Sequence, residues 1–276
     1  MKHISSLGLV AAAVALSAGC DMGRITVGTT AKVLVRAQPS LKMEADWELA
    51  SRAMPGTLKT IEGFWVVAPD NPNLIRLLTE GYCQYGTAFV EDEWETALFA
   101  RNLPLADYHN TRATKMFTRC LNYALLWLGK DWQEGIYAAP EVVQGLIAKT
   151  GAGDRAPLMW AAYALGSVVN HNLDSVEALA QLPTVKAMFT RVLELDEQKL
   201  PDDRTHAALP HIAMGMIYSA TGAQTGGDPK KAEEHFLKAF ALTDSKYLLP
   251  LTMYAYRVGK STQNRALYHD TLVKVL

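Results

Sequence analysis

The densest cluster of residues that could bind a metal ion lies in the stretch PDDRTHAALPH, which carries Asp202, Asp203, His206 and His211. Two histidine ligands on one helix must share a face, as they do at a spacing of about four residues. His206 and His211 are five residues apart, with Pro210 between them. They are therefore poorly placed to share an ion, and we expect no metal site here.

A second acidic cluster is the run Glu91-Asp92-Glu93. Acidic side chains stabilise the first turn of a helix through the helix dipole, so we interpret this run as the solvated start of a helix. The chain contains no Gly-rich phosphate loop, no nucleophile elbow and no paired Cys-x-x-Cys motif. We therefore expect that the protein is not an enzyme and needs no cofactor.

The chain begins with MKHISSLGLVAAAVALSAGC, whose basic end, apolar run and small residues are typical of a secretory signal. The apolar run is shorter than the roughly 20 residues that span a bilayer. Cys20, directly after Ser17-Ala18-Gly19, resembles the bacterial lipobox, in which the cysteine thiol is diacylated, although Leu16 lies one position further upstream than the usual leucine. We predict lipidation of Cys20; the alternative is an ordinary cleavage site beside an incidental cysteine.

These features predict a lipoprotein signal peptide over residues 1–19, a lipidated tether over 20–37 and a helical domain over 38–276. The lipid would anchor the protein in the cell envelope, facing the periplasm. Asp21 beside the lipidated cysteine favours the inner membrane in enteric bacteria, but this sorting rule varies between lineages, so both membranes stay open. With 27 basic and 28 acidic residues, the chain has a net charge of −1, which argues against nucleic acid as a partner.

A four-then-three spacing of small or aliphatic, aromatic, and small or aliphatic residues recurs along the chain. Because residues four and three apart share one helix face, we interpret each copy as the second helix of a helical hairpin. The copies are Ala113, Phe117 and Cys120; Val185, Phe189 and Val192; Ala232, Phe236 and Ala239; with a related rhythm at Thr57, Ile61 and Phe64. This last rhythm leads into Ala68-Pro69-Asp70-Asn71-Pro72, which predicts the end of one helix and the start of the next.

The first helices of three hairpins are predicted over residues 74–90, 159–169 and 212–220, each with a small residue where two helices can cross closely. These small residues are Gly81, Ala164 or Gly166, and Gly215. The pattern resembles tetratricopeptide (TPR) repeats, but long insertions such as 129–157 separate the copies. We therefore predict a compact all-α fold, an irregular TPR-like solenoid of helical hairpins.

In a TPR-like hairpin, the positions one and four residues after the crossing residue point into the concave groove. These positions are apolar or aromatic and carry no charge, which suits a lipid-like ligand or an apolar partner helix. The alternative is that they form the core between repeats. The predicted groove residues are Tyr82, Tyr85, Leu165, Val168, Met216 and Ser219.

Two cysteines, Cys83 and Cys120, remain besides Cys20. They fall on the two helices of one predicted hairpin, so they could approach within the roughly 7 Å between Cα atoms that a disulfide requires. We favour two buried thiols, with a disulfide as the alternative.

Three sequence blocks together resemble one known family, the T component (TatT) of tripartite ATP-independent periplasmic (TRAP) transporters. The blocks are EGFWVVAPDNPNLIRLLTEGYCQYGTAFVEDEWETA from Glu62, QLPTVKAMFTRVLELDE from Gln181, and GGDPKKAEEHFLKAFALTD from Gly226. The resemblance runs from about Gln38 to the end and includes the order of the blocks and the leader. The residue just before the Ala-Gly of the lipobox departs from the pattern.

This resemblance implies a periplasmic lipoprotein that assembles as a homo-oligomer, a trimer, and associates with a periplasmic solute-binding protein. It also implies that the protein presents or relays a hydrophobic small molecule. The competing hypothesis is a TPR lipoprotein that acts as a scaffold for envelope or pilus assembly. Such scaffolds usually display polar concave faces, whereas the predicted groove is apolar.

Overall fold

The computed structural model describes residues 22–220 and 226–276. The predicted signal peptide and the lipidation site Cys20 lie outside the described residues. Helices and turns make up the described part of the chain, which contains no β-strand. The prediction of an all-α fold is confirmed, and the arrangement of its helices is consistent with TPR-like hairpins.

The chain divides into two compact units, one up to Gly81 and one from Tyr82 onward. The sequence predicts one continuous domain over 38–276, and the boundary falls inside a helix, α4 (Pro72–Tyr85). No Gly- or Pro-rich linker marks such a boundary, so the sequence gives no signal for it.

The first unit contains α2 (Met22–Lys42), α3 (Trp47–Val67) and most of α4. Helix α2 occupies most of the segment for which the sequence predicts a tether. Asp46 caps α3 by accepting a hydrogen bond from the backbone N–H of Leu49 at 3.0 Å. As predicted, α3 ends just before the sequence Ala68-Pro69 and α4 begins at Pro72.

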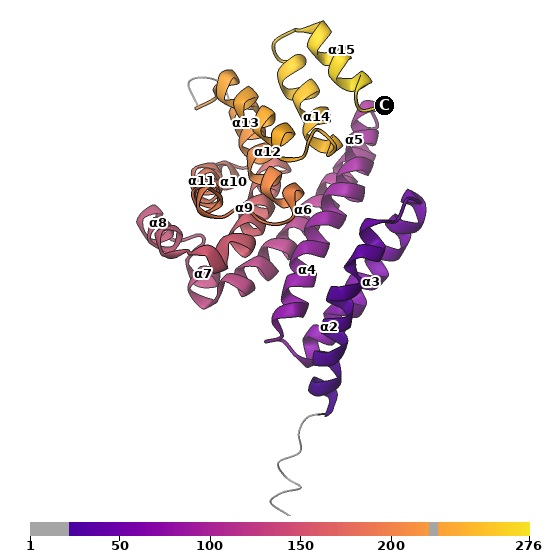
Figure 1. Ribbon diagram of the computed structural model, residues 1–276, viewed down its shortest axis with the longest axis vertical. Coiled ribbons are helices and arrows are strands. Elements are labelled where there is room, and N and C mark those ends of the chain that lie inside the picture. The colour runs from indigo at the N-terminus through magenta and orange to yellow at the C-terminus, as the bar shows by residue number, and fades with distance from the viewer. Residues whose placement is uncertain (1–21, 221–225) are drawn as a thin grey trace, which may run out of the picture. The chain divides into compact units, whose positions relative to one another are not determined.

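The second unit is a succession of helices in chain order, which Figure 1 shows from magenta to yellow. Its elements are the end of α4, the π-helical turn η1 (Gly86–Val90), α5 (Glu91–Phe99), α6 (Leu103–Leu128), α7 (Lys130–Gly135), α8 (Pro140–Lys149), the 3₁₀ turn η2 (Ala152–Asp154), α9 (Arg155–Asn170), α10 (Val176–Leu179), α11 (Leu182–Gln198), α12 (Arg204–Ala220), α13 (Pro229–Leu242), α14 (Leu248–Tyr254), the π-helical turn η4 (Ala255–Gly259) and α15 (Arg265–Val273).

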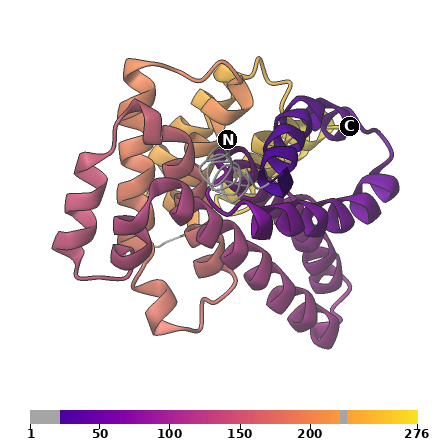
Figure 2. The same cartoon turned by 90° about the horizontal axis from the view of Figure 1, so that it is seen from below.

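Two of the predicted hairpins are the pairs α9 with α11 and α12 with α13. In the first predicted hairpin, α6 is the second helix as predicted, but it packs mainly against α5 and η1, whereas the predicted first helix over 74–90 covers α4 and η1. A fourth pair, η4 with α15, carries no four-then-three aromatic pattern and is missed by the sequence analysis. Neighbouring hairpins pack through α6 on α9, α11 on α12 and α13 on α14, and Figure 2 shows the same succession from a second direction. Helices α7, α8 and α10 fill the insertions, which makes the solenoid irregular.

The core follows the four-then-three pattern. Phe117, Phe189 and Phe236 are all at most 2% exposed, and the small residues on either side of them are buried too. Two glycines allow a neighbouring helix to place a core phenylalanine close to the backbone: a Cβ on Gly86 would lie 3.0 Å from the Phe117 ring, and one on Gly215 would lie 2.9 Å from the Phe236 ring.

The sequence predicts that Gly81 is the crossing residue of the first hairpin. In the structure, the crossing residue is Gly86. Gly81 instead faces Leu58 of α3 inside the first unit. Both glycines lie on one continuous helical run, so the sequence offers two candidates for the same role.

None of the described helices is long and apolar enough to cross a membrane.

Candidate functional site

Helix α9 is fixed at its N-terminal end by a buried ion pair. Arg155 donates two hydrogen bonds to the carboxylate of Asp196 in α11, at 2.8 and 2.7 Å, and a third to the backbone oxygen of His206 in α12 at 3.0 Å. Both charged side chains are more than 90% buried. A buried pair with this two-pronged geometry is charge-assisted and directional, so it fixes α9 against both following helices.

The C-terminal end of α9 is fixed by His171, which is 4% exposed. Its Nδ1 lies 2.7 Å from Oδ1 of Asn110, its Nε2 lies 2.9 Å from Oε1 of Glu91, and its backbone oxygen accepts a hydrogen bond from Asn110. The ring stacks on Phe117 and meets the edge of Trp94. Both hydrogen-bonding nitrogens of the imidazole are therefore engaged.

The contact between Glu91 and His171 corrects the interpretation of the acidic run as a solvated face. Glu91 points to α9, and Glu93 pairs with Arg112 of α6. The cause is the π-helical turn η1, because a π-helical turn contains an extra residue and so rotates the faces of the helix that follows it. The sequence shows no local sign of this cluster, since its members are 61 and 80 residues apart.

The turn η1 also places Thr87 against Tyr163 in the middle of α9, with 2.5 Å between the two hydroxyl oxygens. Burial, followed by the nearby charge of Glu91, raises the pKa of Tyr163 far above its usual range. Tyr163 therefore stays a neutral phenol that links the first hairpin to the second.

Between these fixed ends, α9 borders a hollow of about 360 Å³, which we call the α9–α10 hollow. One of its lining side chains, Tyr137, is 63% exposed. The hollow is lined by Tyr137, Leu165, Val168, Val169, Glu177, Ala178 and Gln181.

Two of the six predicted groove residues, Leu165 and Val168, lie together in this hollow. The other four lie elsewhere. Tyr82 is 2% exposed and stacks on Tyr123 with 6.0 Å between ring centroids, and the Tyr85 hydroxyl accepts a hydrogen bond from Arg112.

Met216 packs against the core of the α12–α13 hairpin, and the Ser219 hydroxyl donates to the Met216 backbone oxygen at 3.0 Å. The six residues therefore do not form one continuous groove. The insertions between hairpins change which positions after the crossing residue face a given side of the solenoid. In the first hairpin, Tyr82 and Tyr85 are also counted from Gly81, whereas the crossing residue is Gly86.

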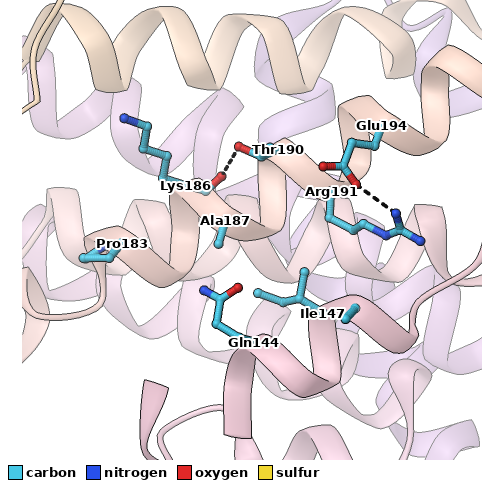
Figure 3. A pocket seen from close by; sticks show the side chains of 9 residues that line it. Gln144, Ile147, Pro183, Lys186, Ala187, Thr190, Arg191 and Glu194 are labelled. Atoms are coloured by element: carbon cyan, nitrogen blue, oxygen red, sulfur yellow. Dashed lines mark hydrogen bonds and ion pairs between the residues drawn. The ribbon is translucent and has the colours of Figure 1, made fainter. Parts of the chain in front are cut away.

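A second groove, of about 550 Å³, lies between α8 and α11. Figure 3 shows Ile147 and Gln144 of α8 facing Ala187 of α11, with Arg191 and Glu194 paired at one end. None of the predicted groove residues lines it. Its rim carries more polar and charged side chains than the α9–α10 hollow does.

With this geometry in view, the family can be assigned. The family model for the TRAP transporter T-component (TAtT) matches residues 43–276. The chain belongs to the T-component family. The resemblance seen in the sequence is thus confirmed over most of the chain. Membership of this family implies an accessory role in TRAP transport, in association with the transporter and the cell envelope. No curated protein matches the chain in sequence.

In this T component, the residues of the titratable cluster do not gather into one site. The His206 ring packs edge-on against Trp160, whereas His211 meets His235 of α13 with 2.9 Å between their Nδ1 atoms. Among residues 22–220 and 226–276, no three His, Cys, Asp or Glu side chains are grouped closely enough to hold a metal ion.

The His211–His235 pair is nevertheless electrostatically unusual. Burial lowers the pKa of His211 to about 4, with further lowering by His235 and Lys238. Burial and Lys238 lower the pKa of His235 to about 4 as well. Both imidazoles are therefore neutral at pH 7, which allows one ring nitrogen to donate to the other.

Cys83 and Cys120 are joined in a disulfide, with 5.3 Å between their Cα atoms. The sequence favours two buried thiols, but the structure contains the disulfide. Cys83 lies near the end of α4 and Cys120 in α6, and both are fully buried. The bond therefore ties the helical run that leads into η1 to α6.

The turn between α5 and α6 displays a cluster of large apolar side chains, which we call the α5–α6 apolar tip. Exposure is 72% for Phe99, 64% for Leu103 and 59% for Tyr108, with Leu98 and Leu105 beside them. Large exposed apolar clusters commonly mark surfaces of protein contact.

Proposed function

We propose that this T component is a lipid-anchored periplasmic protein that docks a TRAP solute-binding protein and relays a hydrophobic small molecule through the α9–α10 hollow. The observation that carries the proposal is the presence of Leu165 and Val168 together in that hollow. These positions are the ones at which a TPR-like helix presents side chains to a ligand. The anchor would be the lipid on Cys20, in either the inner or the outer membrane.

The lining of the hollow favours an apolar ligand with a small polar end. Its volume of about 360 Å³ lies in the range of small-molecule sites, roughly 300 to 1,000 Å³. Leu165, Val168 and Val169 supply the apolar wall, and Gln181 supplies an amide that can orient a polar group. No Lys or Arg lines the hollow, which disfavours a multiply charged anion.

The α5–α6 apolar tip is suited to contact with another protein, and we propose that the solute-binding protein binds there. The family membership supports this choice of partner, because an accessory of a TRAP transporter is expected to meet the soluble component that carries the substrate. The resemblance further implies a homotrimer, which light scattering coupled to gel filtration would test directly. The family match supports this transport role over a scaffold for envelope or pilus assembly.

The ligand proposal is tested with the fluorescent apolar probe N-phenyl-1-naphthylamine. Val168→Phe fills the α9–α10 hollow, and we expect the probe to bind at least about tenfold more weakly, a change of roughly 1.4 kcal/mol. The matched control is Ala187→Phe, which fills the groove between α8 and α11 and should leave the affinity unchanged. Equal affinity of Val168→Phe and the wild type would contradict the proposal, as would a loss confined to Ala187→Phe.

A further inference from the structure

Helix α2 has an unusual distribution of charge. Its charged residues are Arg24, Lys32, Arg36 and Lys42, and it contains no Asp or Glu. Helix α3, by contrast, carries Glu48 and Glu62, each paired with a cation of the same helix. The positive charge of the first unit is thus concentrated on its first helix.

One face of α2 is buried and the opposite face is open. Val27 and Ala31 are buried at 7% and 0% exposure. At a rotation of about 100° per residue, Ile25, Lys32 and Arg36 share the opposite face, with Val33 at its edge. All four are exposed, and the exposed fractions of Ile25 and Val33 are 52% and 59%.

The two acidic side chains that contact α2 are engaged away from this open face. Asp70 pairs with Arg24, and the buried Glu80 accepts hydrogen bonds from Gln38 and Arg76. Within the part of the chain that the structure describes, neither Lys32 nor Arg36 forms an ion pair. An open helix face that mixes cations with aliphatic side chains is typical of helices that lie on anionic lipid.

The position of α2 in the chain gives the second argument. The helix begins at Met22, two residues after the predicted lipidation site, Cys20. Two residues span at most about 7 Å, so a lipid on Cys20 places the first turn of α2 at the headgroups. We propose that the open face of α2 binds the surface of a membrane that contains anionic phospholipid, as a second contact beside the acyl chains.

This inference rests in part on the proposed lipid anchor, so the test removes the lipid. The mature chain from residue 20, with Cys20→Ser, is sedimented with vesicles of phosphatidylcholine alone or of phosphatidylcholine with phosphatidylglycerol. We expect binding to the anionic vesicles only, and release at high salt because screening weakens the attraction. Absence of binding to anionic vesicles would overturn the inference, whatever is found for lipidation of Cys20 or for capture of a solute-binding protein.

Charge-neutral variants locate the contact. Lysine and arginine near an anionic surface contribute about 1 kcal/mol each, so Lys32→Gln with Arg36→Gln should lower the partition coefficient roughly 30-fold. The matched control, Lys115→Gln with Lys199→Gln, removes two exposed cations from α6 and from the residue that follows α11 and should bind like the parent chain. Equal binding by the two double variants would place the contact elsewhere and contradict the proposal; thermal unfolding checks that both fold.

Discussion

Helices α9 and α12 both open hairpins of the same kind, and α9 borders the α9–α10 hollow, whereas no residue of α12 lines that hollow or the groove between α8 and α11. Helix α9 is held at its two ends by buried polar groups, Arg155 with Asp196 and His171 with Glu91. Both helices are also packed along their middles: Leu158 to Leu165 of α9 is largely buried, and Ile212 and Gly215 of α12 lie against the second helix of its hairpin. Helix α9 adds buried polar contacts at both ends to this packing.

The difference shows how a helical solenoid can leave room for a ligand. Polar contacts help to fix both ends of α9, while its middle, from Leu158 to Leu165, is largely buried against the neighbouring helices. The hollow lies beside the last turns of the helix, where Val168 is partly exposed, and α10 and the turn before α8 only partly cover these turns. In α12, apolar contacts fix the helix. A hollow at the corresponding positions of α12 would therefore remove contacts that hold this helix in place.

The largest effect is expected from breaking the buried clamp of α9. Asp196→Ala leaves the guanidinium of Arg155 buried without its anion, and such a change costs about 3 to 5 kcal/mol of unfolding free energy. Urea denaturation measures this loss. The control is Glu194→Ala in the same helix, which breaks an exposed pair with Arg191 and should cost less than about 1 kcal/mol. Similar losses in the two variants would show that the clamp does not hold α9.

The histidine pair of the α12–α13 hairpin predicts acid sensitivity. In the folded protein, the pKa values of His211 and His235 are about 4, below the value of about 6.5 in an unfolded chain. The unfolded state therefore binds more protons between these values. The stabilisation is complete above pH 6.5 and is lost as the pH falls toward 4.

Replacement of both histidines by Gln should flatten this part of the pH profile of unfolding free energy. His269→Gln is the matched control, because His269 is exposed on α15, and its profile should follow the wild type. An unchanged slope in the double variant would mean that other groups cause the acid sensitivity.

Smaller effects are expected from glycine substitutions that compare the two hairpins. In Gly215→Ala the new Cβ meets the buried Phe236 ring at 2.9 Å, so overpacking should cost about 1 kcal/mol net. In Gly166→Ala the Cβ meets one Val185 methyl at 3.1 Å, a cost that the gain in helix propensity, about 1 kcal/mol, offsets.

Gly145→Ala in α8 provides the reference for this pair, because nothing lies within 4 Å of its Cβ. It should be stabilising by about 0.5 to 1 kcal/mol. The three variants are compared by urea denaturation, and a Gly215→Ala protein as stable as Gly166→Ala would contradict the account of tight packing along α12.

The sequence predicts those parts of the fold that depend on one helix at a time. The spacing around Phe117, Phe189 and Phe236 identifies one buried face on each second helix, because the period of the α-helix alone decides which residues share a face. The breaks at Pro69 and Pro72 are predicted for a similar reason, since proline restricts its own backbone and that of the residue before it.

The same reasoning does not predict contacts between helices that are distant in the sequence. The meeting of His211 with His235, or of Glu91 with His171, depends on how two hairpins pack and on the π-helical turn η1, for which the sequence has no signature. The hollow itself needs the insertion that contains Tyr137 and the short helix α10. Two of the six predicted groove residues, Leu165 and Val168, line this hollow together, and their role in binding a ligand stays a prediction.

The central claim, that this protein docks a TRAP solute-binding protein, is tested most directly by capture from an envelope extract. The bait is the mature chain with Cys20→Ser, and mass spectrometry identifies the proteins and small molecules that co-purify. The account predicts a periplasmic solute-binding protein, and a weaker capture by Phe99→Ser with Leu103→Ser in the α5–α6 apolar tip. Recovery of outer-membrane assembly or pilus proteins alone would contradict the claim and favour a scaffold.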